Sequence, residues 1–246
     1  MKTLAPWSSL RRSWIHIQLP GFRSGPAYQT YESSPFDELP PIPIQLDEDC
    51  NWLMKYGTVR AEAGLHRYER NLHPEDVVPL AQQANLPLPA SFIRFMTSAE
   101  LQSRLRSCTD CYLDPGERIV ETTGALSGRL IHFLSDFQYC AHWYLHLLPD
   151  GSHAVLTSQD PYCYLAETSE WIENPACRLE RINLDGLDFA YCARSFSEFL
   201  YRFWIENEIW YALTEKSMPL SLQPLELEYV RHYSSDTRAQ ADSLGE

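Results

Sequence analysis

The stretch LHLLPDGSHAVL, residues 145–156, constrains the fold more than any other part of the chain. Two short apolar runs flank Pro149, Asp150 and Gly151. Proline presets φ for a turn, aspartate is at home in turn conformations, and glycine supplies a positive φ. The pattern therefore predicts a β-hairpin, and with it an antiparallel sheet.

Further strands are expected around this hairpin. Between residues 112 and 182 the chain contains short aromatic and β-branched segments that are separated by turn residues, as is typical of strands. The expected strands are residues 129–137, 141–148, 152–158 and 162–167.

Side chains alternate between two faces along the expected strand 141–148. We expect Trp143, Leu145 and Leu147 to pack against a helix. The opposite face, which carries His142, Tyr144 and His146, is predicted to be exposed.

The histidines in this stretch raise the question of a metal site. On a strand, His142 and His146 are separated by about 13 Å, whereas zinc ligands lie about 2 Å from the ion. One ion cannot easily join them, so we expect no metal there. A less favoured alternative, a metal-dependent enzyme that uses Cys140, His132 and His142, stays open.

Helical patterns lie on both sides of these strands. Residues 75–84 and 90–106 read as helices, and ARSFSEFLYRFWIENEIWYAL begins with Ser195 and Glu198 in the spacing of a capping box. On this last helix we expect Asn207 to bond a loop and Glu206 to line a pocket.

The two ends of the chain look different from its middle. Residues 1–46 are rich in proline, glycine and serine, which favours an irregular arm, and residues 47–74 are expected to be a partly helical extension. The domain is expected to span 75–215, followed by a loosely packed or disordered tail at 216–246.

Charge and composition narrow the function classes. The net charge of −13 disfavours nucleic acid and anionic membranes as partners, and no run approaches the ~20 apolar residues of a membrane helix. The seven cysteines follow no disulfide framework, and the single CxxC at Cys108 and Cys111 predicts two unlinked thiols. We therefore expect a cytoplasmic protein. No phosphate-binding or dinucleotide-binding glycine motif occurs, so no cofactor is predicted.

The order of these elements resembles the SMI1/KNR4 family, also called the SUKH superfamily, over residues 75–213. The similarity rests on the segments LPLPASFIRFM, IHFLSDF and SFSEFL. The matching residues are Leu86, Pro87, Leu88, Pro89, Phe92, Phe95, Ile131, Phe133, Asp136, Ser195, Phe196, Phe199 and Leu200.

The resemblance implies an α+β fold, with a mainly antiparallel sheet packed with helices, and a protein that binds other proteins. Bacterial members of the family are often immunity proteins that neutralise toxins, fungal members are regulators of cell-wall synthesis, and there are no shared catalytic residues to transfer. Three hypotheses follow: a non-catalytic immunity protein for a basic toxin, a regulatory or scaffold protein that uses the N-terminal arm, and the metal enzyme. For the first, the predicted binding surface comprises Asp136, His142, Tyr144, His146 and Glu206.

Overall fold

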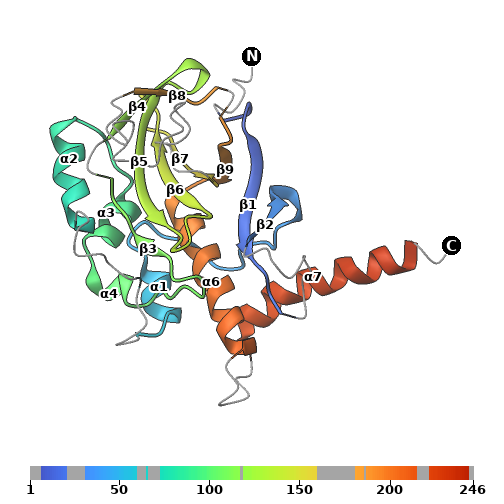
Figure 1. The fold of residues 1–246 in the computed structure, drawn as a ribbon. Helices are drawn as coiled ribbons and strands as arrows, with labels where there is room; N and C mark the ends of the chain where they lie inside the picture. Colours follow the sequence, from blue (N-terminus) through green and yellow to red (C-terminus); the bar gives the residue numbers. More distant parts are fainter. Residues whose placement is uncertain are drawn as a thin grey trace.

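The computed structural model describes residues 7–20, 31–59, 65, 73–116, 119–159, 181–185, 187–214 and 222–243, with side chains up to residue 233. Within these ranges, nine strands form one sheet that is accompanied by six α-helices (Figure 1). Most neighbouring strands are antiparallel, and two pairs are parallel. This arrangement confirms the predicted α+β class with helices packed on a mainly antiparallel sheet. The expected strand 162–167 lies outside the described residues.

The strands follow each other across the sheet in an order that differs from their order in the chain. From one edge to the other they are β2 (Tyr31–Pro35), β1 (Arg11–Ile17), β9 (Ala190–Ala193), β7 (His153–Ser158), β6 (His142–Leu147), β5 (Gly128–Ser135), β4 (Val120–Thr123) and β8 (Arg181–Asn183). The short strand β3 (Tyr112–Leu113) also pairs with β5.

The predicted hairpin is confirmed at the centre of the sheet. Strands β6 and β7 pair in antiparallel register, with Leu145 opposite Val155. The backbone N–H of Leu148 donates to the carbonyl of Ser152 at 2.9 Å, and Gly151 has a φ of 85°. This positive φ is the conformation that a side chain would strain, so glycine fits the turn.

The prediction of an irregular N-terminal arm is wrong for residues 11–17 and 31–35, which form strands of the sheet. Strand β1 lies between β2, with which it pairs antiparallel, and β9, with which it pairs parallel. Its Trp14 side chain is only 2% exposed. The strand begins with two arginines, and its partner β9 is remote in the chain, so local composition gives little sign of a buried strand.

Helix α6 (Phe196–Thr214) crosses one face of the sheet (Figure 1). Trp143 of β6 packs against its Phe199 and Phe203, which confirms the predicted packing of that strand face. Every residue of α6 from Phe196 to Ile209 is buried. The helix is therefore enclosed all round, beyond the single apolar stripe that its periodicity predicts.

The other side of α6 is covered by α1 (Asn51–Tyr56) and α7 (Pro224–Ser243). Trp52 of α1 contacts Tyr201 and Trp204 of α6. Tyr229, in the first turns of α7, is 2% exposed. The prediction of a loosely packed tail is therefore wrong for the start of α7, whose later turns lead away from the sheet (Figure 1).

Three shorter helices complete the described fold. Helix α2 (Val77–Gln83), together with the 3₁₀ turn η2 (Pro74–Asp76), confirms the predicted helix 75–84. The predicted helix 90–106 is instead divided into α3 (Ala90–Met96) and α4 (Ala99–Gln102). The break has a local cause, because the Ser98 hydroxyl accepts from the Leu101 N–H and starts a new helix.

Candidate functional site

The five predicted binding residues are all buried. Asp136, His142, Tyr144 and His146 are each 0% exposed, and Glu206 is 3% exposed. The prediction that they form an exposed surface is therefore wrong. These side chains are internal, and their effect on a binding surface is through the neighbouring residues that they hold in place.

Asp136 organises the loop between β5 and β6, which we call the 136–141 loop. Its Oδ2 accepts hydrogen bonds from the N–H of Gln138 at 2.9 Å and from that of Cys140 at 3.3 Å. Its backbone carbonyl accepts from the Tyr139 N–H at 3.0 Å. A carboxylate that accepts several backbone N–H groups fixes the path of a loop.

The loop presents two aromatic rings to solvent. Phe137 is 54% exposed and Tyr139 is 58% exposed, the two highest values among the large aromatic side chains of the described residues. Tyr139 has a φ of 59°, a left-handed conformation that is unfavourable for a bulky side chain. Strained backbone persists only where the surroundings enforce it, and such positions are enriched at functional sites.

Tyr31 of β2 holds this loop in place through Asp136. Its hydroxyl donates to Asp136 Oδ1 at 2.8 Å and accepts from Thr109 Oγ1 at 2.7 Å. Burial, together with the nearby Cys111 and Asp136, raises the pKa of Tyr31 well above its usual value. Tyr31 thus stays neutral and joins the 136–141 loop to the neighbouring 107–111 turn.

A cluster of polar side chains lies beside the loop, centred on the hydroxyl of Ser135. Ser135 Oγ donates to Asp114 Oδ2 at 2.9 Å and lies 2.9 Å from both His132 Nε2 and His142 Nδ1. One hydroxyl can donate once and accept twice, so both imidazoles donate to it. Burial, followed by the proximity of His132, lowers the pKa of His142 to about 3.

His146 lies on the same strand, is 0% exposed, and belongs to a different hydrogen-bond network. The indole Nε1 of Trp7 donates to His146 Nδ1 at 3.0 Å, and His146 Nε2 lies 3.1 Å from the carbonyl of Leu126. The indole can only donate, so Nδ1 accepts and the proton resides on Nε2. Burial lowers the pKa of His146 to about 4.

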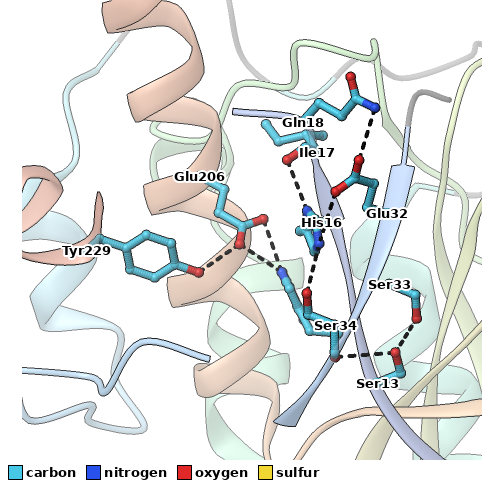
Figure 2. A network of polar contacts seen from close by, with 10 residues as sticks. Ser13, His16, Ile17, Gln18, Glu32, Ser33, Ser34, Glu206 and Tyr229 are labelled. Carbon is cyan, nitrogen blue, oxygen red and sulfur yellow. Dashed lines mark hydrogen bonds and ion pairs between the residues drawn. The ribbon is translucent and has the colours of Figure 1, made fainter. Parts of the chain in front are cut away.

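Glu206 joins three elements of the fold. Its carboxylate accepts from Trp14 Nε1 of β1 at 3.0 Å and from the Tyr229 hydroxyl of α7 at 2.7 Å. Figure 2 shows Tyr229 pointing at Glu206, with the polar contacts of His16, Ser34 and Glu32 between β1 and β2 nearby. The cavity at Glu206 measures about 10 Å³, about the space of one water molecule, so the predicted pocket there is too small for a substrate.

Predictions for α6 and for the 107–111 turn are confirmed. Asn207 Oδ1 accepts from the backbone N–H of Cys108 at 2.8 Å, so this residue does bond a loop. The N–H of Glu198 donates to Ser195 Oγ at 3.1 Å, as expected for the helix cap. Cys108 and Cys111 are free thiols.

The hypothesis of a metal site at Cys140, His132 and His142 finds no support in the arrangement of these residues. The two imidazoles are joined through a serine hydroxyl, and the thiol of Cys140 lies 3.7 Å from the carbonyl of Gln138. Across the ranges that the structure describes, no three His, Cys, Asp or Glu side chains are grouped so as to hold a metal ion. In the same ranges, no helix has the length and apolar character needed to cross a bilayer.

Comparisons with known proteins give no match to a family model, to a curated protein or to a solved structure. The resemblance to the SMI1/KNR4 family stays a prediction. The candidate site therefore rests on geometry alone.

The exposed residues of the site were missed by the sequence analysis, although their neighbour Asp136 was found. Phe137 and Tyr139 lie in DFQYC, where two aromatic residues alternate with polar ones between two strands. A short turn between two strands leaves little room to bury large side chains, so these two aromatic residues could have been predicted to be exposed. Tyr31 gave no such signal, because it lies in the segment predicted to be irregular.

Proposed function

We propose that the protein is a non-catalytic binding module that docks a protein partner on its 136–141 loop. The observation that carries this proposal is a fixed loop that holds Phe137 and Tyr139 in solvent. Large aromatic side chains dominate the binding energy of many protein interfaces. A loop that is already fixed loses little conformational entropy when a partner binds.

The loop is fixed from three directions. Asp136 binds its backbone, Tyr31 holds Asp136 from β2, and the His142 ring lies 5.6 Å from the Tyr139 ring. In this reading Asp136 and His142 are positioning residues for the binding surface and do not contact the partner.

The partner that we propose is a basic protein. The chain carries a net charge of −13, and Asp110 is exposed in the 107–111 turn that Tyr31 joins to the loop. Complementary charge speeds encounter and disfavours wrong partners. With the resemblance, this favours an immunity protein that binds a basic toxin in the cytoplasm.

The test compares three tagged forms of the protein in affinity capture from the native cells, read by quantitative mass spectrometry. They are the unchanged protein, a Phe137→Ser/Tyr139→Ser variant, and a control Tyr56→Ser/Val59→Ser variant. The control removes an aromatic and an apolar side chain that are 37% and 54% exposed elsewhere on the molecule.

We expect one basic protein in stoichiometric amount with the unchanged protein and with the control, and at least about tenfold less with the loop variant. Equal recovery with all three forms would refute the role of the loop. Recovery of a turnover product or substrate-like small molecule in place of a protein would refute a non-catalytic module.

A further inference from the structure

Three exposed arginines lie along the parallel pairing of β1 with β9. Arg11 and Arg12 begin β1, opposite Ala190 and Tyr191, and Arg194 follows the last residue of β9, in a chain whose net charge is −13. Arg11 forms an ion pair with Asp188 at 3.4 Å. No carboxylate of the described residues lies within ion-pair distance of the guanidinium group of Arg12 or Arg194.

The two unpaired arginines lie over a pair of packed aromatic rings. The Cζ of Arg12 is 5.6 Å from the centre of the Tyr191 ring, and that of Arg194 is 5.8 Å from the centre of the Phe36 ring. The rings of Phe36 and Tyr191 are 5.4 Å apart and nearly buried. Stacking on aromatic faces holds guanidinium groups in place while their N–H donors stay free for a ligand.

Tyr191 lies under Arg12 and within electrostatic reach of both arginines. Burial and Glu198 raise the pKa of Tyr191, whereas Arg12 and Arg194 lower it. Glu198 is already engaged, because its Oε1 accepts from Arg202 at 3.2 Å and its Oε2 from the Arg194 N–H at 3.0 Å. The ion pair of Glu198 is formed with Arg202, so the guanidinium groups of Arg12 and Arg194 lie outside it.

We propose that Arg12, Arg194 and the Tyr191 hydroxyl form a binding site for a phosphate group. A carboxylate has two coplanar oxygens and a single charge, which one guanidinium fork satisfies. A phosphate group has three acceptor oxygens and nearly two negative charges, which match two separate guanidinium groups and a hydroxyl donor. The site is distinct from the 136–141 loop and does not depend on the function proposed for it.

The test is a titration of ¹⁵N-labelled full-length protein with inorganic phosphate at constant ionic strength, which keeps non-specific screening unchanged. The arginine Nε–Hε resonances report binding. Arg12→Gln and Arg194→Gln remove one site arginine each, and Tyr191→Phe removes only the hydroxyl. Arg11→Gln is the matched control, because it removes the same charge from the adjacent position of β1.

We expect saturable binding with a Kd in the range of about 1–10 mM. Arg12→Gln and Arg194→Gln should each weaken it by about tenfold, whereas Arg11→Gln should change it by less than about twofold. A second titration with phosphoserine shows whether the site prefers a phosphate monoester or the free ion, since the preferred ligand is the one that binds more tightly.

Three results would overturn the proposal: no saturation, equal weakening in the Arg11 control, or binding of acetate as tight as that of phosphate. All of the altered side chains except that of Tyr191 are exposed, so loss of folding does not confound the arginine variants.

Discussion

The buried His146 should make the stability of the protein depend on pH. Burial lowers its folded pKa to about 4 from the ordinary value of 6.5. As the pH falls below about 6.5, the unfolded chain takes up the proton before the folded protein does. The stabilisation is therefore complete above about pH 6.5 and is lost as the pH falls towards about 4.

The size of the effect follows from the shift. Between about pH 7.5 and pH 4.5, His146 alone should lower the free energy of unfolding by about 2.5 kcal/mol, since one pKa unit corresponds to about 1.4 kcal/mol. The cause of the shift is the burial of the imidazole, whose Nδ1 already accepts the indole N–H of Trp7. A proton on that nitrogen would set two donors against each other and break the contact.

The assay is urea unfolding followed by tryptophan fluorescence at the two pH values, for the unchanged protein and for His146→Gln. The variant does not titrate at this position, so its stability should fall by about 2.5 kcal/mol less than that of the unchanged protein. The same substitution at exposed His73 controls for the loss of a histidine as such. If His146→Gln lost as much stability on acidification as the unchanged protein, the argument from burial would be refuted.

Three further predictions concern buried carboxylates. Asp136→Asn should cost about 1–3 kcal/mol in urea unfolding and increase hydrogen exchange at the N–H groups of Gln138 and Cys140, because an amide accepts these bonds less strongly; unchanged exchange would contradict the anchoring role. Glu206→Leu should cost about 2–5 kcal/mol and lower the melting temperature, because the Trp14 indole and the Tyr229 hydroxyl lose their acceptor; a variant as stable as the unchanged protein would contradict it. Arg106→Met should cost about 3–5 kcal/mol because it removes the guanidinium group that pairs with the buried carboxylate of Glu208, and adding Glu208→Leu should recover most of the loss in the same assay; no recovery would show that the ion pair is not the cause.

Local patterns were sufficient for the centre of the fold. The hairpin of β6 and β7 was predictable because PDG specifies a turn and the flanking runs specify strands. The cap of α6 and the loop contact of Asn207 were predictable for a similar reason. A polar side chain in the middle of the apolar stripe of a helix needs a partner, and here that partner is the backbone of Cys108.

The ends of the chain were not predictable, because their structure depends on distant partners. Strand β1 pairs with the distant β9 along one of its edges, and Trp14 of β1 reaches its acceptor Glu206 across 192 positions of sequence. The prediction that His142 and His146 lie on an exposed face of the sheet was wrong for the same reason. His146 is covered in part by Trp7, a residue of the segment predicted to be an arm.

The pairing of β1 with β9 also has a consequence for folding during protein synthesis. At about 5–20 residues per second, the ribosome needs roughly 10–40 s to make the chain between Trp14 and Glu206. Throughout that time β1, which contains three apolar residues, lacks its partner on the edge that pairs with β9, whereas β2 can cover its other edge soon after synthesis. Such strands are prone to aggregate, so this protein should depend on a chaperone that binds the nascent chain early and releases it only after α6 has left the ribosome.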